Sequence, residues 1–326
     1  MKYLELFKNG FDSTIDEKIK PENWPYVEYS PSEGLRFSMA KTEDGYTLIT
    51  LKKVDISNIS YEEVDLGYGL PIWANKNIGA ASKEDYGTYF SWGNTEGYTA
   101  ITKFLTVEET CSMFSSMFGE EITTKEQLEA IFAAEGVPLE SVSMSEEYSF
   151  DEDSYSTTTG KSLTSDITSE NDAATANMGE AWRLPTIAEY QALIKAVKAN
   201  ENEDGLTCKY IYLDKEGKRQ ELQVYNEKNS GDCFYASGLI DENGNYLFSK
   251  ILGIEFSNDS TNASLYFPAS GVVDGPVLSA IKIHCYYWSS SIINDSGAHT
   301  FYVNQFDIGA DYYGYRRRGL CVRAVK

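Results

Sequence analysis

The chain has 326 residues, with 50 Asp and Glu against 28 Lys and Arg, so its formal net charge is −22. Such an acidic protein repels DNA, RNA and anionic membranes, which excludes nucleic-acid partners. The hydrophobic fraction of 42% excludes wholesale disorder. No apolar run reaches the ~18 residues of a membrane helix, so we expect no membrane insertion.

The first ten residues, MKYLELFKNG, predict no signal peptide, because charges interrupt each apolar run. We therefore expect a protein made in the bacterial cytoplasm that stays there or leaves inside a virus particle. The five cysteines are odd in number and lack a C-x-x-C spacing, which predicts reduced thiols rather than disulfides. The two histidines, His284 and His299, offer little material for a zinc site or a histidine-based triad.

Residues 1–60 predict a small β module. Alternating apolar runs at 26–29, 35–39 and 46–51 indicate three strands, separated by turns rich in Pro, Gly and Asp. A sheet of this size is marginal alone. We therefore expect residues 1–60 to attach to a partner, such as another virion protein, or to pack on the main domain.

Residues 61–326 predict the main domain, in which 101–180 form an elaboration of helices and loops. Helical spacing is present at 107–118 and 125–134, whereas 146–168 is acidic, rich in Ser and Thr, and typical of a loop. The helix that begins after Thr186 has the clearest pattern, with Glu189 at the capping-box position. After this helix, strands are predicted at 208–213, 220–225, 246–248, 263–268, 285–290, 300–306 and 319–325.

Several motifs carry a family resemblance. The run Trp182–Thr186, followed by Glu189, resembles the Arg-Leu-Pro-Thr-x-x-Glu signature of two related families. One is the formylglycine-generating, sulfatase-modifying fold, and the other is the major paralogous domain first named in Fibrobacter and abundant in gut Bacteroidetes proteins. Further segments resemble the second family in the expected order: Val64–Gly67, Leu70–Ala80, Tyr86–Gly93, Leu265–Gly271, Tyr287–Ser291 and Gly319–Arg323.

This resemblance implies an α+β fold, namely a C-type lectin-like domain with a long insertion, preceded by the small N-terminal β module. The resemblance also implies a set of structural signature residues: Trp73, Trp92, Trp182, Arg183, Pro185, Glu189, Trp288 and Arg323. No catalytic residues are expected, because the signature run offers no nucleophile–base pair, and no metal site is expected either.

The sequence lacks the residues on which the known activities of these related folds depend. Formylglycine-generating enzymes need two closely spaced cysteines near the C-terminus, whereas Cys285 and Cys321 are far apart in the sequence. The calcium-binding triplets of lectins are absent, so no cofactor is expected, although Asp151–Asp153 and Asn258–Ser260 leave a structural Ca²⁺ site open. Arg316–Arg318 could clamp an anion, or could pair with acidic loops and anchor the last strand.

Residues 292–315 form a tract rich in Tyr, Asn, Asp and Ser, a composition typical of adaptable binding loops. The tract resembles the variable region of C-type lectin proteins diversified by retroelements, and also ordinary members of the family. We expect Trp288 to lie beneath this tract. The predicted ligand-binding residues are Asn294, Asp295, Tyr302, Asn304, Asp307, Asp311, Tyr312, Tyr313 and Tyr315.

Together these observations predict a non-enzymatic binding protein that is part of a bacteriophage particle, as a head or tail fibre or decoration. Its expected ligand is a glycan or protein on the host cell surface. The alternatives are a bacterial surface adhesin and, third, an enzyme of the formylglycine-generating type. A homo-oligomer remains open.

Overall fold

The computed structural model describes residues 29–30, 34–35, 37–41, 45–52, 55–118, 121–135, 139–140, 163, 165–236, 238–240, 246–274 and 277–326. The protein is 36% strand and 15% helix, and these residues contain four α-helices. The predicted α+β, C-type lectin-like fold is therefore wrong, because the fold is β-rich. Segments without a predicted strand, notably 249–258 and 307–315, pair with strands that are distant in the sequence.

The chain forms two compact units. The first comprises residues 1–53, 100–150 and 275–278, and the second comprises residues 54–99, 151–274 and 279–326. The predicted attachment role of residues 1–60 stays a prediction, and residues 1–28 and 141–162 lie outside the described residues. No helix in the described ranges is long and apolar enough to cross a membrane.

The first unit combines short strands with two helices. Strand β3 pairs antiparallel with β4 and parallel with β9. The predicted helices at 107–118 and 125–134 are confirmed, and each begins with a capping box, formed by Thr106 with Glu109 and by Thr124 with Gln127. The elements are β1 Tyr29–Ser30, β2 Gly34–Leu35, β3 Phe37–Lys41, β4 Gly45–Lys52, β8 Tyr98–Thr106, α2 Val107–Phe118, α3 Lys125–Glu135 and β9 Leu139–Glu140, with β16 Val277–Ser279 at its boundary.

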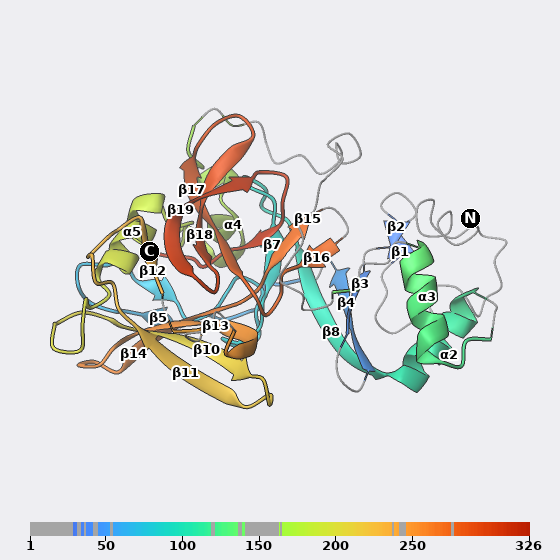
Figure 1. The fold of residues 1–326 in the computed structure, drawn as a ribbon. Helices are drawn as coiled ribbons and strands as arrows, with labels where there is room; N and C mark the ends of the chain where they lie inside the picture. Colours follow the sequence, from blue (N-terminus) through green and yellow to red (C-terminus); the bar gives the residue numbers. More distant parts are fainter. Residues whose placement is uncertain are drawn as a thin grey trace. The chain divides into compact units, whose positions relative to one another are not determined.

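The described part of the second unit contains two larger sheets, in which most strands are antiparallel, and a two-stranded sheet of β5 and β6 (Figure 1). One of the larger sheets has the strand order β11-β10-β13-β14, and the other has the order β12-β19-β18-β17-β20-β7 within this unit. The elements are β5 Glu63–Val64, β6 Trp73–Ala74, β7 Thr88–Phe90, η4 Ser169–Asn171, α4 Ala173–Met178, α5 Ile187–Lys195, β10 Thr207–Asp214, β11 Arg219–Val224, β12 Cys233–Tyr235, β13 Phe248–Asn258, β14 Ala263–Pro268, β15 Val272–Asp274, β17 Cys285–Ile292, β18 Gly297–Val303, β19 Asp307–Tyr315 and β20 Leu320–Cys321.

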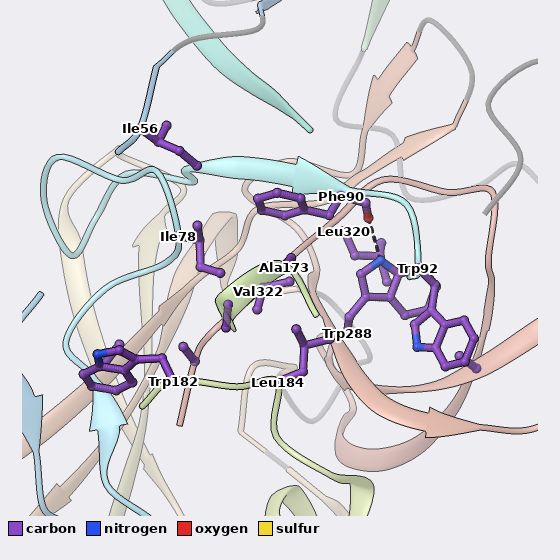
Figure 2. Packing of buried hydrophobic residues seen from close by; sticks show 14 residues of the cluster. Ile56, Ile78, Phe90, Trp92, Ala173, Trp182, Leu184, Trp288, Leu320 and Val322 are labelled. Atoms are coloured by element: carbon purple, nitrogen blue, oxygen red, sulfur yellow. Dashed lines mark hydrogen bonds between the residues drawn. The ribbon is translucent and has the colours of Figure 1, made fainter. Parts of the chain in front are cut away.

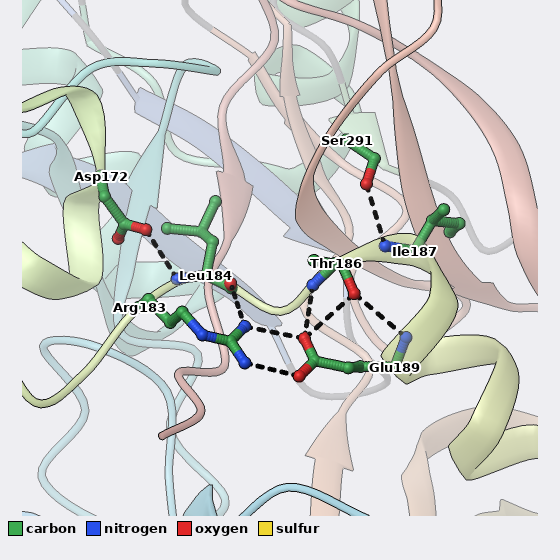
Figure 3. A network of polar contacts seen from close by, with 7 residues as sticks. All are labelled: Asp172, Arg183, Leu184, Thr186, Ile187, Glu189 and Ser291. Atoms are coloured by element: carbon green, nitrogen blue, oxygen red, sulfur yellow. Dashed lines mark hydrogen bonds and ion pairs between the residues drawn. The ribbon is translucent and has the colours of Figure 1, made fainter. Parts of the chain in front are cut away.

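Helix α5 is fixed to the sheet at its first turn (Figure 3). The predicted capping box is confirmed: the Thr186 hydroxyl accepts from the Glu189 amide, and the Glu189 carboxylate accepts from the Thr186 amide. The Arg183 guanidinium donates to both oxygens of the same carboxylate, at 2.8 and 2.6 Å. Ser291 of β17 accepts from the amide of Ile187. A local sequence signal thus positions the helix against β17.

The core beneath β17 is built on tryptophans (Figure 2). Trp288 is 1% exposed and packs in one hydrophobic cluster with Trp92, Phe90 and Leu320. Each indole also donates a hydrogen bond, from Trp288 to the Phe90 carbonyl at 2.6 Å and from Trp92 to the Ser289 carbonyl at 2.9 Å. Both rings are therefore buried without an unpaired polar group, and they hold β17 against β7.

Candidate functional site

Tyrosines gather on one face of the sheet formed by β17, β18 and β19. Tyr286 of β17 pairs directly with Tyr302 of β18. The Tyr312 ring of β19 lies 4.9 Å from the Tyr302 ring and 5.7 Å from the Tyr286 ring, measured between centroids. We call Tyr286, Tyr302 and Tyr312 the tyrosine platform. Tyr312 is 42% exposed, whereas the other two are partly buried and support it.

A bulge and a glycine create the tyrosine platform. Thr300 pairs with Tyr312 but Tyr302 pairs with Gly309, so β19 holds one residue more than β18 over this interval. The extra residue brings Tyr312 onto the face that carries Tyr302. A Cβ atom at Gly309 would lie 2.4 Å from a carbon of the Tyr302 ring, so only glycine lets this ring lie against the backbone of β19.

Polar groups border the tyrosine platform. The His284 ring nitrogen Nδ1 lies 3.5 Å from the Tyr286 hydroxyl, and the Cys233 sulfur lies 3.5 Å from the Tyr302 hydroxyl. Burial lowers the pKa of His284 and raises the pKa values of both hydroxyls and of the Cys233 thiol. These groups are therefore uncharged at pH 7, and they present hydrogen-bonding atoms beside the rings.

Two charged side chains act on the platform from its borders. The Arg318 guanidinium opposes the rise in the pKa of Tyr286, and the Asp307 carboxylate adds to the rise in the pKa of Tyr302. Asp307 lies two residues from Gly309 on β19, so its side chain shares the face of the tyrosine platform, whereas the Arg318 guanidinium lies over the Tyr315 ring. The Asp307 carboxylate can accept hydrogen bonds from a polar ligand.

Tyr313 does not belong to this surface. Tyr312 and Tyr313 are successive residues of β19, so their side chains point to opposite faces of the sheet. The Tyr313 hydroxyl lies 2.7 Å from the Ser296 hydroxyl and 3.3 Å from the Asn294 amide oxygen. Its ring contacts Tyr315 at a centroid distance of 5.1 Å. Tyr313 therefore stabilises the β17–β18 hairpin.

The other predicted ligand-binding residues are divided among separate places. Asp311 lies 2.8 Å from the His299 ring nitrogen Nδ1, and the Asn304 side chain caps the β18–β19 turn by accepting from two amides. Asn294 accepts from amides in the β17–β18 turn, where Asp295 is exposed. Among the described residues, the structure thus divides the predicted set into two groups on opposite faces: Tyr302, Tyr312 and Asp307 on the platform face, and Asn294, Tyr313 and Tyr315 on the other.

The tandem arginines bind aromatic rings and backbone carbonyls. Arg316 is buried over the Trp92 ring at 4.5 Å and donates to the carbonyls of Leu163 and Asn294. Arg317 and Arg318 lie over the Tyr315 ring at 4.7 and 4.9 Å. Arg316 therefore anchors the turn that follows β19 and is not available to clamp an anion.

The signature residues are structural in character. Trp73 packs 5.5 Å from the Tyr190 ring, and the Lys326 ammonium lies over the Trp182 ring. Arg323 is fully buried, and its guanidinium donates to the Asn77 amide oxygen at 3.0 and 2.7 Å and to the Tyr266 carbonyl at 2.8 Å. Burial lowers its pKa. Pro185 contributes its carbonyl, which accepts from the Ser290 amide of β17.

Neither proposed calcium-binding segment gains support. Residues 151–153 lie outside the described residues. Asn258 and Asp259 already accept hydrogen bonds, from Ser260 and from Thr207 with Lys198 respectively. Across the described part of the chain, no three His, Cys, Asp or Glu side chains gather as metal ligands.

Four residues of this site were not predicted from the sequence to belong to it, namely Tyr286, His284, Cys233 and Gly309. The signal for Tyr286 was present, because alternation along a strand places it on the face opposite to buried Tyr287. The remaining residues depend on strand pairing that no local pattern reveals. No family model, curated protein or solved structure matches this chain.

Proposed function

We propose that this protein is a non-enzymatic binding protein that recognises a glycan or protein on a cell surface through the tyrosine platform. The observation that carries this proposal is the contact of three tyrosine rings on one sheet face, with Tyr312 42% exposed. Tyrosine gives a large contact area at a low cost in conformational entropy, which is why it dominates binding surfaces. The rigid sheet beneath the rings fixes them before a ligand arrives.

The chemistry of the buried thiols supports a binding role over the formylglycine-generating alternative. Cys285 and Cys321 lie on neighbouring strands, but both are fully buried. Burial raises the pKa of Cys321 to about 12 and also raises the pKa of Cys285. A thiol in that state is protonated at pH 7 and is a poor nucleophile.

We also propose that the protein is part of a bacteriophage particle. The alternative is that it is an adhesin on a bacterial surface. The predicted attachment to other virion proteins involves residues 1–60, most of whose side chains lie outside the described residues. The tyrosine platform serves either setting, because recognition depends on the exposed rings and not on how the protein is anchored.

The test is binding of the fluorescently labelled full-length protein to a panel of intact bacteria that includes Bacteroidetes. The Tyr302→Ala, Tyr312→Ala double variant is expected to lose binding at least tenfold, with retained folding checked by circular dichroism. The matched control is Tyr68→Ala, since Tyr68 is 44% exposed and lies outside the platform. Equal binding by the platform variant and the wild type would reject the proposal.

A further inference from the structure

The small size of the tyrosine platform limits the kind of ligand it can hold. This inference rests on the proposed function and narrows its ligand. A stable protein partner buries ~800 Å² on each side, whereas one tyrosine side chain buries at most ~150–250 Å². Tyr286 and Tyr302 are already partly buried against Tyr312, so they offer less than that. The exposed surface matches one or two small rings better than a protein interface.

The charge of the site selects an uncharged ligand. The Tyr286 and Tyr302 hydroxyls, the His284 ring and the Cys233 thiol are neutral at pH 7, and the Asp307 carboxylate shares their face of the sheet. The chain as a whole carries a formal net charge of −22, which repels polyanions. Neither the site nor the charge of the whole chain therefore favours a phosphorylated, sulfated or otherwise acidic ligand.

The geometry points to the apolar face of a pyranose ring in an uncharged glycan as the ligand of the tyrosine platform. The face of an aromatic ring is negative, and it attracts the polarised C–H groups that line one side of a pyranose. The ring hydroxyls of the sugar project at its edge, where the Asp307 carboxylate can accept hydrogen bonds and the His284 ring and the Tyr286 and Tyr302 hydroxyls offer further hydrogen-bonding atoms. Tyr312, as the most exposed ring of the three, is the stacking surface.

The experiment uses the full-length protein on a printed glycan array. The array carries uncharged oligosaccharides ending in glucose, galactose, mannose or N-acetylhexosamines, and sialylated, sulfated and uronate-containing oligosaccharides. We expect binding to uncharged glycans, with little change between 50 and 500 mM NaCl because no ion pair is involved. Tyr312→Ala should weaken this binding at least tenfold, whereas Tyr312→Phe should retain it, since the phenylalanine ring still stacks. Tyr68→Ala is the control.

Each outcome decides either the ligand class or the function. Binding only to acidic glycans, or equal binding by Tyr312→Ala and wild type on the array, overturns the glycan inference. The glycan inference is also overturned if no glycan on the array binds the protein. It is overturned as well if cells whose sugars have been destroyed by periodate still bind the protein through the tyrosine platform. In these cases the proposed function survives with a protein as the ligand. If the platform variants bind both cells and glycans as well as the wild type does, the glycan inference and the proposed function are both overturned.

Discussion

The ring of Tyr302 lies against the backbone of Gly309 on the neighbouring strand, where a Cβ atom would come within 2.4 Å of a ring carbon. The two residues pair directly across β18 and β19. The glycine therefore determines where the ring lies, and the ring in turn supports Tyr312 at 4.9 Å. A change at Gly309 is therefore expected to affect both ligand binding and the stability of the fold.

Gly309→Ala should destabilise the protein and weaken ligand binding together. The added methyl group forces the Tyr302 ring away from β19, at a cost of ~1–3 kcal/mol, as overpacking usually does. Chemical denaturation of wild type, both single variants and Gly309→Ala with Tyr302→Ala forms a double-mutant cycle. We expect the alanine at 309 to cost much less when Tyr302 is absent. Additive free energies would show that the ring and the glycine do not interact.

The fold was predictable from the sequence where the determining contacts are local. The start of α5 follows from Thr186 and Glu189, which are three residues apart and cap the same turn. Strand β19 was not predictable in this way. Its Gly309 and Gly314 resemble loop glycines, yet each makes room for an aromatic ring from another strand of the sheet, Tyr302 of β18 in one case and Trp288 of β17 in the other.

The site shows the same division between local and long-range information. Composition drew attention to the tyrosines of 292–315, but it could not sort them by face. One bulge places Tyr312 with Tyr302 and leaves Tyr313 on the opposite side. The fold class failed for a related reason, because the resemblance rested on short motifs whereas strand pairing over long distances determines a β-rich fold.

Tyr312 and Tyr313 should give opposite mutant phenotypes although they are adjacent. Tyr312→Ala removes an exposed ring and should abolish recognition with little change in melting temperature. Tyr313→Ala removes the contacts to Ser296 and Asn294, and should cost ~1 kcal/mol of stability while leaving ligand binding intact. Thermal melting and cell binding of the two single variants check this. Loss of binding in Tyr313→Ala without unfolding would contradict the assignment of faces.

Trp288→Ala should destabilise the second unit by ~3–5 kcal/mol, as large-to-small changes in a core do. The substitution empties a site that is 1% exposed and leaves the Phe90 carbonyl without its donor. Trp288→Phe serves as the control, because it fills most of the volume and lacks only the indole N–H. Urea denaturation measures both variants. A loss below ~1 kcal/mol in Trp288→Ala would mean that this indole does not support the sheet.

His284 should make the protein less stable in mild acid. Burial lowers its folded-state pKa below the ordinary value of about 6.5, so the unfolded chain binds the proton more readily. The contribution of neutral His284 to stability is therefore fully present above about pH 6.5 and is lost as the pH falls through the folded pKa. Urea denaturation from pH 8 to pH 5 should show a smaller decline in the free energy of unfolding for His284→Gln than for wild type. Wild type and His284→Gln have the same carboxylates, so the difference between their free energies of unfolding reports the protonation of the His284 imidazole. Parallel curves would show that His284 is as easily protonated in the folded protein as in the unfolded chain.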